Sequence, residues 1–403
     1  MFNIVIVGAG ASGMVTAIVA SRQGKKVLLL EKNNKVGKKL LATGNGKCNI
    51  LNQRPTLEHF YSQHPLFVAS VFKDYSYYEV RQFFRSIGLE LVEAKEGKVF
   101  PMSLQASSVV ELLEAECEQL GVKILCDTLV EKITYKKNQY TIQHTKGRVE
   151  SPTLVIATGH VSAPQLGGVL DGVNFAKSFG HKIVKDFPTL VQLTSSRKDL
   201  KQIAGVKVES RVTLKGKSSK TIHKYGDVLF TSYGISGLAI LDISRAVMKE
   251  LIHTPKVTLT IDLMPKMSEA QLLSLMKKSL RKKSEKPVPL WLQGFIHKKL
   301  ISVVLKPLKL EDLVESKIKI EHLEKIVKAI KEFEFVVNGS RGYKGAEVAT
   351  GGVDVKEVNP KTMESKKQKG LYFTGEVLDV DGDRGGFNLY FAWVCGLRAG
   401  KSV

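Results

Sequence analysis

The sequence predicts an α/β fold whose first domain is built on a doubly wound parallel sheet, and three observations support this class. The chain opens with a buried strand at 3–7, a glycine-rich turn, a helix to about Gln23 and a second strand at 27–32. This order describes a right-handed βαβ unit. From about 190 to 262 the pattern changes to short alternating runs, and a glycine-rich strand-to-helix pattern returns after 345. We therefore expect a first domain interrupted by inserted ones.

The other elements follow from hydrophobic periodicity and from glycine positions. Glycine and asparagine are too frequent in the stretch after the second strand for a regular element, so we expect a long loop there. The lysine-rich region before the C-terminal part has helical spacing. We expect a loop at 37–52, helices over 57–88 and 103–121, strands within 122–159, mostly strands over 190–262, helices over 268–332, and one strand, a glycine loop and a final helix over 370–400.

Length and composition describe an ordinary globular chain of two or three domains. The chain has 403 residues, of which 43% are apolar and 25% charged. Its 4 cysteines form no C-x-x-C pair, which argues against a disulfide scaffold, a thiol-redox pair and a Cys-rich zinc site. We expect no metal site and a cytoplasmic protein. No apolar run reaches the roughly 18 residues of a membrane span, and we expect no signal peptide.

The charge is strongly positive, with 61 Lys and Arg against 39 Asp and Glu and a net charge of +22. This balance favours anionic partners. However, the lysines alternate with glutamate and leucine at helical spacing, so we interpret them mainly as a solvated surface. The most basic stretches, 277–286 and 297–299, have only Trp291 and Phe295 as neighbouring aromatic residues for base stacking. The sequence therefore does not favour nucleic acid, which stays the minor alternative, and it leaves the oligomeric state open.

The motif GAGASG at 8–13 carries the strongest chemical signal. Its first glycine permits a tight turn, its second lets the backbone approach a pyrophosphate, and Gly13 allows the helix to pack closely on the strand. Glu31 closes the second strand, where an acid accepts hydrogen bonds from the adenosine ribose. This context favours a dinucleotide site over a structural turn, but the motif alone does not separate FAD from NAD.

Two further features favour FAD. No second G-x-G-x-x-G follows a strand, and the C-terminal loop TGEVLDVDGDRGGFN is another glycine-rich strand-to-helix connection. Glu376 in this loop would face a ribityl chain or phosphate-bound water. The N–H groups of 386–389, at the start of the last helix, would stabilise negative charge on a reduced flavin. The alternative is a loop that only reverses the chain.

These stretches resemble the bacterial NAD(P)/FAD-dependent oxidoreductase family that includes BaiN-like, aminoacetone oxidase-like and YhiN-like flavoproteins. The resemblance spans almost the whole chain, and GKKLLATGNGKCNILN and GEVLDVDGDRGGFN are its most specific motifs. It implies a Rossmann-like, glutathione-reductase-like FAD-binding domain with inserted β-rich and helical domains. The implied boundaries are 1–190 plus 345–403 for the FAD-binding domain, 191–265 plus 333–344 for the β-rich domain, and 266–332 for the helical domain.

The resemblance also implies the residues that bind FAD, from the pyrophosphate motif to the flavin ring. Val130 would meet the adenine through its backbone. Two positions depart from the family pattern: His160 replaces a usual glycine and is expected to be a hydrogen-bonded loop residue, and Arg384 would bind an anionic substrate or pair with a neighbouring aspartate. The residues expected to bind FAD are Gly8, Ala9, Gly10, Ala11, Ser12, Gly13, Glu31, Lys32, Lys39, Thr43, Gly44, Asn45, Gly46, Val130, Ala157, Thr158, Gly159, Gly375, Glu376, Gly386, Phe387, Asn388 and Leu389.

The resulting hypothesis is an FAD-dependent oxidoreductase that transfers hydride between a small organic substrate and the flavin. NAD(P)H, bound transiently, or dioxygen would be the second redox partner. No side chain is assigned a catalytic role, and Cys48 is interpreted as structural. The candidate substrate-lining residues are Tyr233, Arg341, Tyr343 and Arg384. An RNA-binding or tRNA-modifying flavoprotein and a flavin-free structural protein are the alternatives.

Overall fold

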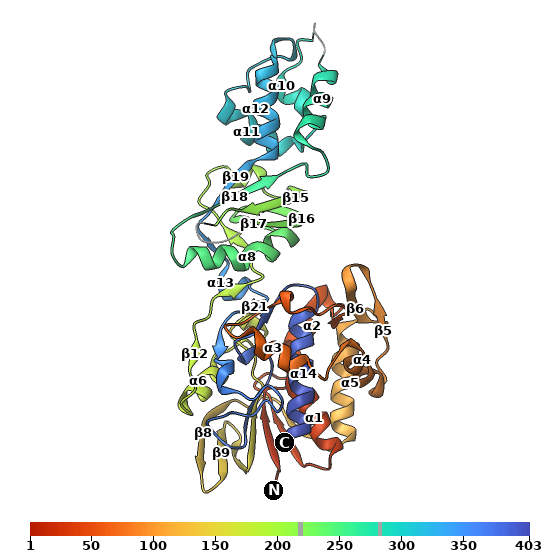
Figure 1. The fold of residues 1–403 in the computed structure, drawn as a ribbon, viewed down its shortest axis with the longest axis vertical. Helices are drawn as coiled ribbons and strands as arrows, with labels where there is room; N and C mark the ends of the chain where they lie inside the picture. Colours follow the sequence, from red (N-terminus) through yellow and green to blue (C-terminus); the bar gives the residue numbers. More distant parts are fainter. Residues whose placement is uncertain (217–220, 281–283) are drawn as a thin grey trace. The chain divides into compact units, whose positions relative to one another are not determined.

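The computed structural model describes residues 1–216, 221–280 and 284–403. Their contacts divide the chain into two units, a first unit of Met1–Phe187 with Glu347–Val403 and a second unit of Pro188–Ala346. Both chain ends thus belong to the first unit (Figure 1). The lysine-rich stretch 277–286 and the alternating run 220–234 lie partly outside the described residues.

A five-stranded parallel sheet organises the first unit and confirms the predicted α/β class. Strand β1 is central, because its Ile4 pairs with Val27 of β2 on one side and with Thr153 of β11 on the other. All four residues of β1 are buried, as expected for a strand covered on both faces. The sheet has the order β23-β11-β1-β2-β7, with β1 (Ile4–Val7), β2 (Val27–Leu30), β7 (Lys123–Leu125), β11 (Thr153–Ile156) and β23 (Leu371–Phe373).

Two helices from opposite ends of the chain lie side by side in this unit: α1 (Ala11–Arg22) and α14 (Phe387–Ser402) (Figure 1). Their backbones approach closely, because a Cβ built on Gly396 would lie 2.7 Å from the Ser12 carbonyl oxygen. A third helix, α5 (Ala106–Gln119), packs against α1. The start of α14 is thereby fixed relative to the glycine motif that opens α1.

The rest of the first unit consists of short elements, and two expectations for it were incomplete. The stretch 37–52 is not a plain loop, because it contains a helix, a 3₁₀ turn and a strand. The stretch 57–88 holds two helices and a strand. The elements are α2 (Lys38–Leu41), α3 (Pro65–Phe72), α4 (Tyr77–Ser86), α6 (Asp171–Ser178), β3 (Leu51–Asn52), β4 (Phe60–Tyr61), β5 (Leu91–Glu93), β6 (Lys98–Pro101), β8 (Val130–Lys136), β9 (Gln139–His144), β10 (Gly147–Ser151), β12 (Ile183–Val184), β21 (Val348–Ala349), β22 (Gly352–Val353) and β24 (Asp381–Gly382).

The second unit is built on a seven-stranded sheet with the order β19-β18-β15-β16-β17-β14-β20. Its pairings are antiparallel, which agrees with the alternating pattern of the sequence. Two helices within this stretch were not expected: a short one at Leu200–Ile203, and α8 (Leu238–Leu251), which packs on β15 and β16. The strands are β13 (Pro188–Thr189), β14 (Leu193–Thr194), β15 (Lys207–Leu214), β16 (Ile222–Thr231), β17 (Gly234–Ser236), β18 (Val257–Asp262), β19 (Phe333–Val337) and β20 (Gly339–Ser340).

Most helices of the second unit share one hydrophobic core with its sheet. Leu323 and Ile326 of α12, for example, are fully buried in the same cluster as Phe335 of β19. The separation of a β-rich from a helical domain stays a prediction. None of the helices among the described residues combines the length and apolar character that a membrane crossing requires. The remaining helices are α7 (Leu200–Ile203), α9 (Glu269–Ser279), α10 (Val288–Leu292), α11 (Lys298–Leu305), α12 (Ile320–Lys331) and α13 (Gly342–Gly345).

Candidate functional site

The glycine motif forms a narrow turn between β1 and α1. Gly8 has φ +106°, and a Cβ on it would lie 2.5 Å from the Ala157 carbonyl oxygen. A Cβ on Gly13 would lie 2.0 Å from the Gly8 carbonyl oxygen, so neither position accepts a side chain. Gly10, by contrast, has no described protein atom within 4 Å of its Cβ position. It is also the N-cap of α1 and supplies no side-chain cap, so the first N–H groups of the helix are available to an anion.

Glu31 connects the end of β2 to this turn. Its side chain is buried, and its Oε2 accepts a hydrogen bond from the Ala9 N–H at 2.8 Å. Oε1 accepts one from the Asn33 N–H, also at 2.8 Å. The carboxylate therefore holds the glycine turn in place, in addition to the ribose role that the sequence predicts for it.

A charged cluster from three separate segments lies beside the turn. The Lys39 ammonium is 2.7 Å from Oε2 of Glu376, and it donates to the Ser162 hydroxyl at 2.6 Å. That hydroxyl donates to Oε1 of Glu376 at 2.7 Å. Burial works to raise the pKa of Glu376, but Lys39 and the Ser162 hydrogen bond outweigh it and hold the pKa below its usual value. Glu376 is thus a carboxylate at neutral pH. The sequence analysis did not single out Ser162.

His160 is buried next to this cluster as a hydrogen-bonded loop residue. Its Nδ1 accepts a hydrogen bond from the Val161 N–H at 2.8 Å, so this nitrogen carries no proton. Burial lowers the pKa of His160, and the opposing influence of Glu376 and Asp186 does not restore it. The ring is therefore neutral near pH 7.

The C-terminal glycine loop packs against the segment around β3. Gly386 has φ +95°, and a Cβ there would lie 2.4 Å from the Leu51 carbonyl oxygen. The Asn52 side chain donates to the Gly385 carbonyl at 3.0 Å. Gly386 is the N-cap of α14, which has no side-chain cap and no acidic residue in its first turn. The helix therefore begins with N–H groups available to a ligand, as the sequence analysis expected for a flavin.

Asn388 and Phe387, which were expected to contact the flavin, also contact other residues of the protein. The Asn388 side chain pairs with Gly382, accepting from its N–H at 2.7 Å and donating to its carbonyl at 2.8 Å. The buried Phe387 ring stacks on His59, with ring centroids 4.1 Å apart. Both contacts fix the loop at the start of α14, and Leu389 in the same turn is partly buried against the core.

The loop after α2 has an unusual backbone. Gly44, Asn45 and Gly46 have φ values of +56°, +54° and +81° and are exposed. Three successive left-handed residues present their backbone groups differently from a helix or strand, which suits contact with an extended ligand. Cys48, which follows, is fully buried, and burial raises its pKa to about 11. It is a neutral thiol at pH 7, in agreement with the structural interpretation.

The remaining expected cofactor residues lie in the first unit. Gly375 approaches the glycine motif, because a Cβ on it would lie 2.8 Å from Oγ of Ser12. Thr43 donates its hydroxyl to the Leu40 carbonyl at 2.6 Å. Val130 is buried at the start of β8, Lys32 is half-buried after β2, and Ala11 is the first residue of α1. Thr158 and Gly159 follow β11 closely, and a Cβ built on Gly159 would lie 3.9 Å from Oε2 of Glu376.

The expected substrate-lining residues fall into both units. In the second unit, the Arg341 guanidinium lies 4.8 Å from the centroid of the Tyr233 ring, a cation–π contact. Tyr343 lies two residues further on, in α13. Arg384 belongs to the first unit, where it helps, after Lys98, to lower the pKa of Glu96. That these residues line the flavin site stays a prediction.

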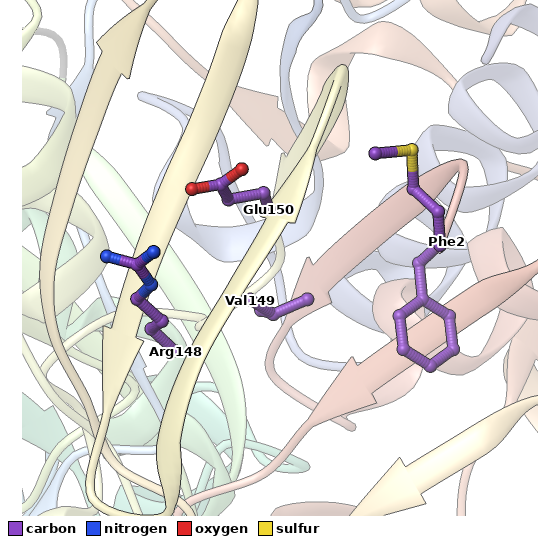
Figure 2. A pocket seen from close by; sticks show the side chains of 5 residues that line it. Phe2, Arg148, Val149 and Glu150 are labelled. Carbon is purple, nitrogen blue, oxygen red and sulfur yellow. The ribbon is translucent and has the colours of Figure 1, made fainter.

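A depression of about 360 Å³ lies elsewhere in the first unit. It is lined by Met1 and Phe2 and by Arg148, Val149 and Glu150 of β10 (Figure 2). Met1 and Phe2 precede β1, whereas the glycine motif follows its other end. We therefore assign this depression no part in the dinucleotide site. Among the described residues, no three His, Cys, Asp or Glu side chains are grouped as metal ligands.

Comparison with known proteins gave matches over the full chain. The family model described as HI0933-like protein Rossmann domain matches residues 2–402. A relative from Clostridium scindens, named 3-dehydro-bile acid delta(4,6)-reductase, is 34% identical over 100% of this chain and 99% of its own length. Two relatives are named ribosomal RNA dihydrouridine synthase. The one from Haemophilus influenzae is 34% identical, covering 99% and 98% of the two chains. The one from Escherichia coli is 30% identical, covering 97% and 95%.

Proposed function

The chain belongs to the HI0933-like family, and from this premise we propose that it reduces a carbon–carbon double bond conjugated to a carbonyl group. The protein is an FAD-dependent oxidoreductase. The names of its relatives give different substrates but the same bond change. A delta(4,6)-reductase of a 3-dehydro bile acid, by its name, acts on carbon–carbon double bonds at positions 4 and 6, which are conjugated with the ketone at position 3. A dihydrouridine synthase saturates the double bond of a uracil ring beside its carbonyl.

The observation that carries the proposal is the pair of glycine-capped helix starts in the first unit. Helices α1 and α14 both begin without a side-chain cap, after Gly10 and Gly386 respectively. The first would hold the FAD diphosphate, and the second would face the edge of the flavin where negative charge develops on reduction. Bound FAD would supply the hydride acceptor and donor. Glu31 would bind the ribose while it braces the turn through Ala9.

We propose NAD(P)H as the electron donor, because a reductase requires a hydride source. The sequence has one dinucleotide motif, so NAD(P)H would bind transiently and leave before the substrate enters. Such an enzyme works in two half-reactions, reduction of the flavin and its reoxidation by the alkene. Dioxygen as the physiological partner fits the reductase names less well.

A second candidate narrows the substrate to a uridine in ribosomal RNA. The sequence analysis did not favour nucleic acid as a partner. However, two relatives are named ribosomal RNA dihydrouridine synthase, and the net charge of +22 is consistent with binding to RNA phosphates. Lysine and arginine bind the phosphate backbone without regard to sequence, and such binding weakens steeply with salt. The bile-acid reductase name favours a free small molecule instead.

The test is anaerobic rapid mixing of the FAD-loaded protein. We expect NADH or NADPH to bleach the flavin absorbance, and a conjugated alkene to restore it. The two probes are a 3-oxo-4,6-diene steroid and ribosomal RNA transcribed in vitro without modifications, with dihydrouridine detected by mass spectrometry. Restoration by RNA alone supports the second candidate. If neither alkene restores the absorbance while dioxygen does, the reductase proposal is wrong.

A further inference from the structure

We propose that His59 is the proton donor of this reduction and that Asp383 and Tyr61 position it. The inference rests on the proposed function, because only the reduction of a conjugated alkene needs a proton at carbon after hydride transfer. The sequence analysis did not single out His59 or Tyr61. They lie far along the chain from Asp383, and no local pattern joins the two segments.

A short antiparallel ladder brings these residues together. Strand β4 pairs with β24, with Tyr61 opposite Asp381 and Phe60 opposite Gly382. Continuing the register by one residue places His59 opposite Asp383, and the Asp383 N–H donates to the His59 carbonyl at 2.8 Å. The ladder therefore fixes both backbones at the point where the two side chains meet.

The side chains form a hydrogen-bonded triad. Nδ1 of His59 lies 3.1 Å from Oδ2 of Asp383, and the Tyr61 hydroxyl donates to Oδ1 of the same carboxylate at 2.9 Å. Both oxygens of Asp383 thus have partners. A carboxylate held in this way keeps the proton of the ring on Nδ1 and leaves Nε2 as the second proton site.

The triad is held against the start of α14. The His59 ring stacks on Phe387, the first residue of that helix, with 15° between the ring planes. Asn388 donates to the Asp383 carbonyl at 3.3 Å. His59 is therefore fixed to the turn whose N–H groups are proposed to face the flavin. Its side chain is 38% exposed, and Nε2 has no hydrogen-bond partner among the described residues, so this nitrogen is accessible.

Other candidate acids in the first unit are less suited to proton donation. Cys48 is buried, and Nδ1 of the buried His160 already accepts from a backbone N–H. The Lys39 ammonium is committed to Glu376 and Ser162. His59 combines a fixed ring, a charged partner and access to water, as a general acid requires.

The proposed step balances as follows. Bound FAD, reduced by NAD(P)H, would supply the hydride that forms the C–H bond at the carbon β to the carbonyl. The π electrons of the alkene move toward the carbonyl oxygen and give an enolate. Nε2–H of the His59 imidazolium then protonates the α carbon, and the carbonyl re-forms. The neutral ring regains a proton from water, while Asp383 balances the positive charge of the imidazolium before the transfer.

The experiment separates the two half-reactions in variants of the FAD-loaded full chain. His59→Asn keeps a donor toward Asp383 but removes the Nε2 acid. We expect reduction of the flavin by NAD(P)H to keep its rate, and reoxidation by the alkene to slow by about 10²- to 10⁴-fold. Exogenous imidazole should restore part of the reoxidation rate in His59→Ala. The control is His253→Gln, at an exposed histidine of the second unit, which should leave both rates unchanged.

The roles of Asp383 and Tyr61 are tested by the rate of flavin reoxidation in their own variants. Asp383→Asn and Tyr61→Phe should slow reoxidation less than the loss of His59 does, at saturating alkene and with unchanged FAD content. In His59→Asn these substitutions should have little further effect, because they act through the ring. A simple loss of structure would instead lower the FAD content and slow both half-reactions.

Two outcomes overturn the inference. One is a His59→Asn variant that is reoxidised at the wild-type rate. The other is equal slowing of both half-reactions in His59→Asn and in His59→Ala, without rescue by imidazole, which would show a structural role. Failure of the proposed function looks different, because the reduced wild-type protein itself would then not be reoxidised by either alkene.

Discussion

At the residue scale, Gly10 differs from the other two glycines of the motif. Side chains at Gly8 and Gly13 would collide with backbone oxygens, whereas Gly10 has φ −87° and open space at its Cβ position. We predict that Gly10→Ala keeps the stability of the FAD-free protein but weakens FAD binding by at least about tenfold, because the methyl group occupies the approach of the diphosphate. FAD titration and thermal unfolding of the apoprotein measure the two effects.

Two comparisons make this prediction specific. Gly13→Ala should destabilise the apoprotein as well, since its Cβ would lie 2.0 Å from the Gly8 carbonyl oxygen. Gly294→Ala in the second unit, where the nearest contact of a Cβ would be 3.4 Å away, should leave FAD affinity unchanged. An unaltered FAD affinity in Gly10→Ala would contradict the assignment of the diphosphate to this turn.

The Lys39–Glu376 pair gives a pH-dependent prediction. The folded pKa of Glu376 is lowered, so the pair contributes stability above the unfolded pKa of about 4.3, and this contribution is lost as pH falls through the folded pKa. In Lys39→Met, burial would instead raise the pKa of Glu376. We expect the free energy of unfolding to fall by about 1–2 kcal/mol at neutral pH. This value lies between those typical of exposed and of buried ion pairs, because the Lys39 side chain is 35% exposed. Denaturant unfolding across pH measures it.

The sign of the pH effect distinguishes charge from packing. The deficit of Lys39→Met should shrink as pH falls from the unfolded pKa of about 4.3 through the lowered folded pKa of Glu376, because below that point Glu376 is protonated in both proteins. Lys38→Met, at the neighbouring position of α2, is the control and should show a small deficit at every pH. A constant deficit in Lys39→Met would mean that lost contacts of the lysine stem, and not the ion pair, cause the destabilisation.

At the scale of elements, the sequence predicted what local patterns encode. The strand, glycine turn and helix of β1 and α1 each follow from adjacent residues, and so does the final helix α14. Helix α8 was missed because its apolar spacing lies between two alternating stretches that suggest strands. Helix α2 has four residues, too few for a period to be visible. Periodicity thus fails where an element spans barely one repeat, as in α2, and where a helix lies between alternating stretches, as in α8.

The residues of the candidate site were likewise predictable only where they lie in local sequence motifs. Glu31, Lys39 and Glu376 were found because each lies in a motif of one continuous segment. Ser162 and His59 were not, because their roles depend on contacts with residues 376 and 383, far along the chain. The ladder of β4 and β24 has two residues on each strand, which leaves no alternation to detect. Such contacts are decided by tertiary packing and not by local sequence.

The close packing of α1 on α14 gives a prediction for an element. A Cβ on Gly396 would lie 2.7 Å from the Ser12 carbonyl oxygen and 2.9 Å from Cβ of Val15. Gly396→Ala should therefore push the helices apart and lower the free energy of unfolding by about 1–3 kcal/mol. Because α14 then shifts relative to the glycine motif, FAD affinity should also fall. Ser402→Ala, at the other end of α14, is the control, and equal stability of Gly396→Ala and wild type would contradict the packing.

At the scale of the whole molecule, the first unit needs both chain ends. Strand β23 completes the parallel sheet beside β11, although about half of the chain separates these strands in sequence. Helix α14 covers α1, although the two helices lie near opposite ends of the chain. The second unit leaves and rejoins the first at neighbouring positions, since the Phe187 N–H donates to Oγ1 of Thr350 at 2.9 Å and the Thr350 N–H to the Phe187 carbonyl at 3.0 Å. An insertion with adjacent ends puts little strain on its host.

This arrangement predicts that the two units fold separately. Replacing residues 188–346 by a short Gly/Ser linker should leave a folded first unit that binds FAD, because its core and both uncapped helix starts lie within it. Residues 188–346 alone should also fold, around their own core. Circular dichroism, thermal unfolding and FAD titration measure both. The linker-joined protein carrying Gly10→Ala is the control, since it should fold and bind FAD poorly. Loss of cooperative unfolding in the linker-joined protein would show that the second unit is required to complete the FAD-binding fold.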